Sequence, residues 1–279
     1  MRNFLRASAF IAVGFGLAGF GGVESLFAPK AELWERWTTS DEASRENVDH
    51  GAWERFLKTY VKTSGDGVNR VAYNTVNTAD RDALDHYIRA LVASSVTQLN
   101  RAEQQAYWIN LYNALTVKLI LEYKPEKSIQ DIDISPGLFS SGPWDKKLLE
   151  IEGEAVSLND IEHRILRPIW QDPRIHYAIN CAAIGCPNLQ KSPFTAANTE
   201  ALLDAAAREY INDLRGVRYE DGKVVVSSIY AWFTDDFGGD IAGVITHLKQ
   251  YAGPRVMALL DSAGEYDDAY DWTLNGTAP

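Results

Sequence analysis

The sequence predicts a helix-rich α+β fold with a small antiparallel sheet. Two observations favour this class: apolar residues follow helical spacing over most of the chain, and short strand-like segments flank Glu152-Gly153 and Asp221-Gly222. The 279 residues are 46% hydrophobic, which is enough to bury a core. Because no repeat, low-complexity tract or linker interrupts residues 29–279, we expect them to form a single α+β domain.

The first 28 residues are expected to be a targeting segment that precedes the fold. Two arginines come before an apolar stretch, Ala7 to Phe20, whose length suits a signal peptide better than a membrane-spanning helix. Val23-Glu24-Ser25 offers small residues for cleavage. We therefore predict a signal peptide at residues 1–28, with an uncleaved anchor as the alternative, and a periplasmic or secreted mature chain.

The charge balance limits the kinds of partner. The formal net charge is −11, with 38 acidic and 27 basic residues. Nucleic-acid binding needs clustered Lys and Arg to neutralise phosphates, so this class is disfavoured. Attraction to an anionic membrane surface after signal removal is disfavoured for the same reason. The expected partner is an unidentified ligand or substrate.

The clearest predicted helix begins after Asn100. Asn100 and Glu103 have the spacing of a capping box, and Pro125 ends the helix. Apolar residues lie on nearly every face, so this helix should be central to the fold. Its two buried amides, Asn110 and Asn113, must then find partners. Either they brace neighbouring loops, or one of them faces a site.

The other elements follow from the same signals. Further helices are predicted at 31–60 with a polar break at 39–49, from Asp80 through Leu91, from Ser157 to Pro168, from Thr195 to about Leu214, and at 229–233, 241–251 and 254–260. Strands are predicted at 68–76, 147–151, 154–156, 217–219 and 223–226, with an edge strand at 270–274.

The stretch from Asp172 to Pro187 contains both cysteines and one of the five histidines. Its alternating apolar and polar residues, bounded by Asp172-Pro173 and Gly185-Cys186-Pro187, predict a short strand that ends in a turn. A strand that brings thiols to a turn suits either a reactive site or a small disulfide.

One hypothesis for this stretch is a thiol nucleophile at Cys181, acting in a thiol-dependent hydrolase or acyl transferase. Such a thiol needs an imidazole beside it and a group that orients the imidazole. On a straight strand His176 and Cys181 would point to opposite faces, so His163 is the better partner, but a bend after Ile179 would remove this objection to His176. The orienting group could come from Glu162, Asn110, Asn113 or Asn159.

The alternative is a structural disulfide between Cys181 and Cys186 in a non-catalytic periplasmic binding domain. The two residues are five apart with Gly185 between them, and an exported protein can form such a bond. The sequence leaves both hypotheses open, and with them the question of whether the protein is an enzyme.

No cofactor or metal is predicted. A metal site from His163, His176, Glu162 and a cysteine lacks supporting spacing, and there is no Gly-rich phosphate loop or Gly-x-Ser-x-Gly motif. Acidic residues beside Gly238-Gly239 are expected to cap a loop: Asp235, Asp236 and Asp240. Three histidines are expected on solvated surfaces: His50, His86 and His247.

Four runs of residues, in the same order over roughly Trp53 to Asn275, resemble the family catalogued as domain of unknown function 547. These runs are Tyr107–Leu115, Ser157–His163, His176–Pro187 and Trp232–Gly239. The resemblance implies an uncharacterised family whose bacterial members are often exported. It implies no catalytic residues.

Overall fold

The computed structural model describes residues 28–137 and 142–277. The predicted signal peptide therefore lies almost entirely outside the described residues. Within the described ranges, no helix has the length and apolar character needed to cross a membrane.

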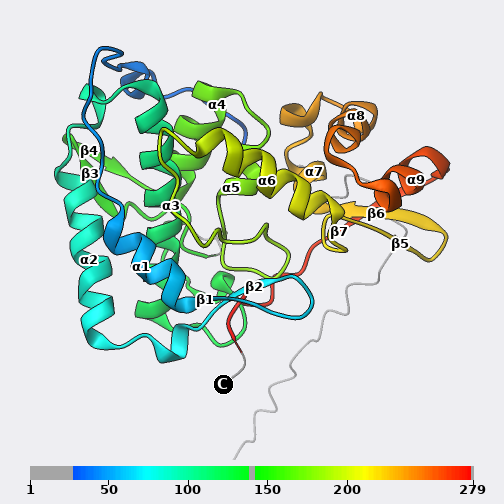
Figure 1. Cartoon of the computed structure of the whole chain (residues 1–279), viewed down its shortest axis with the longest axis horizontal. Helices are drawn as coiled ribbons and strands as arrows, with labels where there is room; N and C mark the ends of the chain where they lie inside the picture. The colour runs from blue at the N-terminus through cyan, green and yellow to red at the C-terminus, as the bar shows by residue number, and fades with distance from the viewer. Residues whose placement is uncertain (1–27, 138–141, 278–279) are drawn as a thin grey trace, which may run out of the picture.

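Helices dominate the structure, and the strands are short (Figure 1). In chain order the helices are η2 (Glu35–Thr38), α1 (Gly51–Tyr60), η3 (Tyr73–Thr75), α2 (Thr78–Ala93), η4 (Val96–Gln98), α3 (Arg101–Tyr123), η5 (Ile129–Asp131), η6 (Asp160–Leu166), α4 (Arg167–Trp170), α5 (Ile175–Ala178), α6 (Thr199–Asn212), α7 (Ser228–Trp232), η7 (Thr234–Phe237), α8 (Ile241–Tyr251) and α9 (Pro254–Ser262). The strands are β1 (Val61–Thr63), β2 (Asn69–Val71), β3 (Leu149–Ile151), β4 (Glu154–Val156), β5 (Val217–Glu220), β6 (Lys223–Ser227) and β7 (Tyr266–Ala269). The predicted helix-rich α+β class is confirmed.

Helix α3 is central, as predicted. The Asn100 side chain caps it by accepting the N–H of Glu103, and Lys124 ends it in a left-handed conformation at φ 49°. Only half of the capping box forms, because the Glu103 carboxylate accepts the N–H of Val48 instead. Nearly every residue of α3 is buried, so the helix forms the axis of the larger core.

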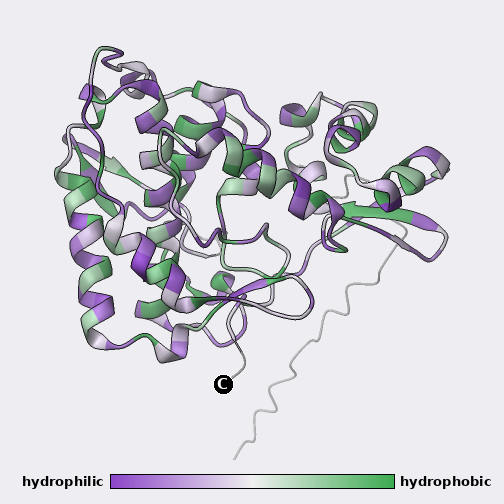
Figure 2. Ribbon diagram, viewed as in Figure 1, coloured by the Kyte–Doolittle hydropathy of each residue, from purple (hydrophilic) through white to green (hydrophobic). Residues whose placement is uncertain are grey.

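Two apolar clusters make up the interior. The larger surrounds α3 and includes α1, α2 and η6. The smaller lies between α6, the sheet and α7 to α9. Figure 1 shows these groups on opposite sides of the molecule, and Figure 2 shows the hydrophobic residues of β6 within the second group. Residues from both clusters line the cavity described below.

The predicted hairpins at β3–β4 and β5–β6 are confirmed, and β1 pairs with β2 in the same antiparallel manner. The third strand of the larger sheet differs from expectation. Strand β7 pairs with β6 in parallel, because α8 and α9 carry the chain back before β7 begins. The tail at 270–274 forms a single bridge between Leu274 and Ala183 rather than a strand.

The helix predicted to end at Pro168 continues through α4 to Trp170. Its first part, η6, is a π-helix, in which the Arg167 N–H bonds the carbonyl of Glu162. A proline inside a helix leaves a carbonyl without its N–H donor, and its ring crowds the carbonyl four residues earlier. The prediction was wrong because the helix continues past Pro168 with the carbonyls it leaves open bonded elsewhere.

Those carbonyls are satisfied from outside the helix. His163 O accepts the N–H of Glu32, and Arg164 O accepts the N–H of Trp34. These are the two acceptors that Pro168 would otherwise bond in the π and α registers. The segment at 32–34 therefore makes the continuous helix possible.

The strand predicted between Asp172 and Pro187 is also wrong. Pro173 begins a turn, and the next residues form the single helical turn α5, with Ile175 N–H bonded to Asp172 O. Pro is favourable at the second position of such a turn because its ring fixes φ near the value that the turn needs. After α5 the chain is extended at Ile179 (φ −96°, ψ 138°), so His176 and Cys181 do not lie on one straight strand.

Gly185 lies where this loop meets the C-terminal segment, and we expect Gly185→Ala to destabilise the protein. A Cβ there would be 2.8 Å from Asp271 N and 3.0 Å from Asp271 O. Such overpacking should lower the free energy of unfolding by about 1–3 kcal/mol in urea titrations. Gly65→Ala is the control, since no atom lies within 4 Å of that site. Equal effects of the two substitutions would contradict the close packing at Gly185.

Candidate functional site

A cavity of about 430 Å³ lies where residues of the two clusters meet. Helices α3, η6, α5 and α7 contribute to its wall, together with the loop at 181–187 and the segment after β7. Its lining comprises Ala28, Pro29, Tyr112, Gln130, Trp144, Asp145, Asn159, Glu162, His163, His176, Ile179, Cys181, Cys186, Pro187, Ile229, Trp232, Phe233, Tyr270 and Trp272. This volume falls within the range of small-molecule sites.

The π-helix η6 places two consecutive titratable residues, Glu162 and His163, on the cavity wall. One extra residue per turn changes the direction in which neighbouring side chains point, and such segments are frequent at functional sites. His176 reaches the same wall from α5, and its Nδ1 lies 3.8 Å from Glu162 Oε1. Three sequence-predicted residues thus come together.

Asp236 and Arg167 lie behind these residues. Asp236 Oδ2 accepts the Arg167 Nε–H at 2.6 Å and lies 2.7 Å from His176 Nε2. Burial disfavours charge on Asp236, but the hydrogen bonds from His176 and Arg167 outweigh it and lower the pKa of this carboxyl well below its usual range. Asp236 therefore remains an anion, and His176 Nε2 carries a proton toward it.

The two imidazoles bond their neighbours through different ring nitrogens. Arg167 donates an N–H to His163 Nδ1 at 2.9 Å, so the proton of neutral His163 is on Nε2. In His176 the proton on Nε2 faces Asp236, which leaves the Nδ1 lone pair directed at the side of Glu162. Burial lowers the pKa of both rings, and Arg167 adds to the effect at His163. Both are neutral at pH 7.

Glu162 is only 8% exposed. Burial raises its pKa to about 7, although Arg167 and a hydrogen bond with Tyr112 act in the opposite direction. This carboxyl can thus hold a proton near neutral pH while the neighbouring His176 has none on Nδ1. A protonated carboxyl beside an unprotonated imidazole is the arrangement that acid–base chemistry needs.

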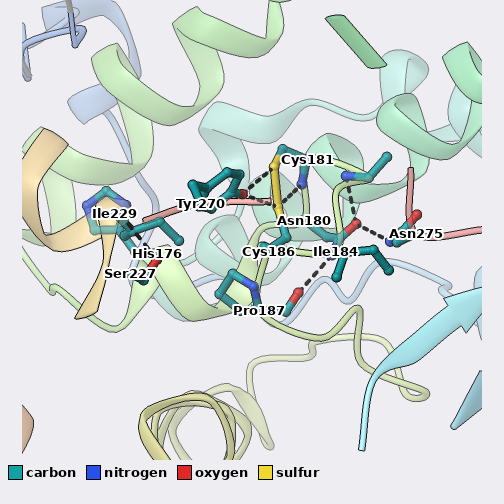
Figure 3. The surroundings of a disulfide bond; sticks show 12 residues. His176, Asn180, Cys181, Ile184, Cys186, Pro187, Ser227, Ile229, Tyr270 and Asn275 are labelled. Atoms are coloured by element: carbon teal, nitrogen blue, oxygen red, sulfur yellow. Dashed lines mark hydrogen bonds between the residues drawn. A yellow bond between two sulfur atoms is a disulfide. The ribbon is translucent and has the colours of Figure 1, made fainter. Parts of the chain in front are cut away.

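Cys181 and Cys186 form a disulfide, as the alternative hypothesis predicted. Their Cα atoms are 6.2 Å apart, and neither cysteine is free (Figure 3). While this bond is closed, Cys181 offers no thiolate. His163, predicted as its partner, bonds Arg167 instead.

The two amides of α3 bond the backbone of neighbouring segments. Asn110 pairs with both the N–H and the C=O of Phe194, at 3.0 and 2.7 Å. Asn113 donates to Ala178 O at 2.9 Å and accepts the N–H of Asn180 at 2.8 Å. Neither amide lines the cavity among the described residues. Asn113 fixes the chain between His176 and the disulfide.

Two histidines expected on the surface are buried. His50 Nδ1 lies 2.6 Å from Tyr87 Oη, and His247 Nε2 lies 2.8 Å from Tyr177 Oη. They are 5% and 6% exposed, and burial lowers both pKa values to about 4. The prediction failed because the burying aromatic residues come from distant segments. His86 is exposed, as expected.

Asp240 caps α8 by accepting the N–H of Gly243, whereas Asp236 differs from its predicted role as a loop cap. Sequence reasoning also missed Arg167. One available signal was the spacing of four between His163 and Arg167, which lie on the same face of a helix. The pairing of Asp236 with that face is long-range and carries no local signal.

One side of the cavity is an aromatic wall made of Trp144, Trp232, Tyr270 and Trp272. Ring centroids are 4.8 Å apart for Trp232–Tyr270 and for Tyr270–Trp272, and 5.8 Å for Trp144–Trp272. These contacts fix the rings as one surface. No Lys or Arg is among the described lining residues, and the described part of the chain contains no group of three or more metal-binding side chains placed to hold an ion.

The fold and cavity define a helix-rich α+β protein whose ligand-sized site carries a carboxyl and two neutral imidazoles. Residues 96–211 match the family model described as "Protein of unknown function, DUF547", which confirms the resemblance predicted from the sequence. The matched region contains Glu162, His163, His176 and both cysteines, but not Asp236. No curated protein and no solved structure matches the chain.

Glu162→Gln is expected to change how stability depends on pH. Burial raises the pKa of Glu162 from 4.5 to about 7 on folding, so ionisation opposes folding progressively between these pH values and fully above them. The wild type should thus lose roughly 3 kcal/mol relative to the variant between pH 4 and pH 8, at about 1.4 kcal/mol per pH unit.

Urea unfolding of both proteins at the two pH values measures this difference. Glu46→Gln, at an exposed position, serves as the control and should track the wild type within about 0.5 kcal/mol at both pH values. A Glu162→Gln effect independent of pH would refute the raised pKa.

Proposed function

We propose that the protein is a hydrolase that uses general acid–base catalysis, with Glu162 as the acid and His176 as the base. The observation that carries this proposal is the 3.8 Å separation of Glu162 Oε1 and His176 Nδ1 on the cavity wall. Their environments place the proton on the carboxyl and leave the imidazole unprotonated. Pairs whose pKa values are displaced in this way identify acid and base roles.

The proposed reaction is hydrolysis of an ester or amide. His176 Nδ1 removes a proton from a water molecule as the water oxygen bonds the acyl carbon. Asp236 stabilises the resulting imidazolium through Nε2–H and keeps the ring oriented. Glu162 gives its proton to the leaving oxygen or nitrogen. The proton on His176 then returns to Glu162, which restores both groups.

The cavity limits the substrate class. The aromatic wall can bury an apolar or flat part of a ligand, and its packed rings lose little freedom when a ligand binds. Without a lysine or arginine among its described lining residues, the site offers no ion pair to an anionic ligand. We infer a neutral acyl compound.

The thiol-dependent form of the hypothesis needs Cys181 as a free thiolate. The closed disulfide supports a water nucleophile instead. It also supports an oxidising compartment, so we keep the proposals of a signal peptide or anchor at residues 1–28 and a periplasmic or secreted mature chain. Two hydrogen bonds between distant segments support one domain over residues 29–279: Glu32 N–H donates to His163 O of η6, and Val71 N–H of β2 donates to Asn275 O.

A non-catalytic binding domain is the second candidate. The aromatic wall beside a closed disulfide favours it, since neither feature needs chemistry. The two candidates assign different roles to Glu162 and His176. A binding domain would bind its ligand without converting it, whereas a hydrolase would need both side chains to convert the ligand.

We expect the wild type to hydrolyse members of a panel of neutral p-nitrophenyl esters and p-nitroanilides. The kcat/KM profile should fall below the lowered pKa of His176, where the base is protonated, and above about pH 7, where Glu162 has lost its proton. Glu162→Gln and His176→Gln should each lower kcat/KM by about 10²- to 10⁴-fold, and Glu162→Gln should remove the alkaline limb.

His86→Gln is the matched control, because His86 is exposed and bonds only its own helix. It should leave kcat/KM within about twofold of the wild type. Hydrolysis that survives both site substitutions would contradict the assigned roles, and ligand binding without turnover would favour the binding domain.

A further inference from the structure

We propose that the Cys181–Cys186 disulfide is a thiol–disulfide exchange site facing the cavity, in which Cys181 is attacked and Cys186 leaves. The two sulfurs differ in their surroundings. Both residues line the cavity, but Cys181 is partly exposed whereas Cys186 is only 3% exposed. A thiol that enters the cavity therefore reaches Cys181 Sγ first.

Hydrogen bonds favour Cys186 as the leaving sulfur. Its Sγ accepts the backbone N–H of Cys181 at 3.0 Å and the hydroxyl of Tyr270 at 3.0 Å (Figure 3). Donors aimed at a sulfur stabilise the thiolate that forms there, and a more stable thiolate leaves faster. Tyr270 Oη also lies 3.0 Å from Cys181 Sγ, but its single proton serves the sulfur that gains charge.

The loop between the cysteines has supports other than the disulfide. Ile184 N–H bonds Thr273 O at 2.7 Å, and Gly185 N–H bonds Asp271 O at 2.8 Å. Tyr210 Oη donates to Gly185 O at 2.5 Å. A cross-link over so few residues also adds less stability than one that closes a long loop. These contacts keep the two sulfurs close after the bond opens, so it can form again.

The exchange takes place in two steps. A thiolate attacks Cys181 Sγ, the S–S bond breaks, and its electron pair goes to Cys186, which becomes a thiolate. A second thiol then attacks the external sulfur of the mixed disulfide. The products are an external disulfide and two protein thiols, so two electrons pass from the thiols to the protein. The reverse sequence oxidises Cys181 and Cys186 at the expense of an external disulfide.

The test uses the full chain without denaturant and 2-mercaptoethanol, a small neutral thiol that suits a cavity without lysine or arginine among its described lining residues. Samples quenched with iodoacetamide are mapped by mass spectrometry. We expect reduction with a rate proportional to thiol concentration, and a mixed disulfide on Cys181. Reduction at the rate of global unfolding, independent of thiol concentration, or an adduct on Cys186 would overturn the proposal.

Tyr270→Phe tests the leaving-group role. It should slow reduction about tenfold, because the charged leaving sulfur loses one of its two donors. The matched control is Tyr266→Phe, whose hydroxyl bonds Leu260 O rather than a sulfur, and it should react like the wild type. Equal rates for the two variants would refute the role of Tyr270.

Single-cysteine variants give an independent readout if Tyr270→Phe disturbs the aromatic wall. Cys186→Ala leaves a thiol at Cys181, and Cys181→Ala leaves one at Cys186. The first should react with iodoacetamide, a neutral reagent, at least tenfold faster than the second, following the exposure of the two residues. The opposite order would assign attack to Cys186 and overturn the proposal.

Discussion

The site depends on the ion pair between Arg167, which is buried, and Asp236, which is half-buried. Arg167 is 6% exposed, and its guanidinium also bonds His163 Nδ1 and the carbonyl of Pro29. Removing Asp236 would leave the buried guanidinium without its carboxylate, a change that costs about 3–5 kcal/mol in fully buried pairs. Asp236 accepts the proton on His176 Nε2, and Arg167 donates to His163 Nδ1. The two partners of the ion pair thus select the tautomers of both rings. One guanidinium thus determines which nitrogens face the cavity.

The irregular helix and the ion pair are parts of the same arrangement. Arg167 N–H bonds Glu162 O in the π register, so the residue that binds Asp236 also closes the wide turn that directs Glu162 and His163 to the cavity. Pro168 prevents the usual hydrogen bonds of the next turn, and the chain at 32–34 provides donors for the carbonyls left over. A proline that typically ends a helix here leaves the helix dependent on hydrogen bonds from a distant segment.

Local rules predicted much of the fold and little of the site's detail. The cap at Asn100 and the hairpins at Glu152-Gly153 and Asp221-Gly222 were predicted well, because caps and tight turns are decided by a few adjacent residues. The disulfide was predicted as an alternative from the spacing of the cysteines and the expected export. The conformation around His176, the continuation past Pro168 and the partner of Asp236 were not predicted. At His176 a local turn beginning at Asp172-Pro173 replaces the expected strand, and distant residues decide the other two.

The contacts at residues 29–34 have a mechanical consequence. Pro29 O bonds Arg167, Glu32 N–H bonds His163 O, and Ala28 and Pro29 line the cavity. Any force applied to the chain ahead of Ala28 would therefore be transmitted through these hydrogen bonds to the π-helix. A tether at that end would couple tension directly to the spacing between a carboxyl and an imidazole.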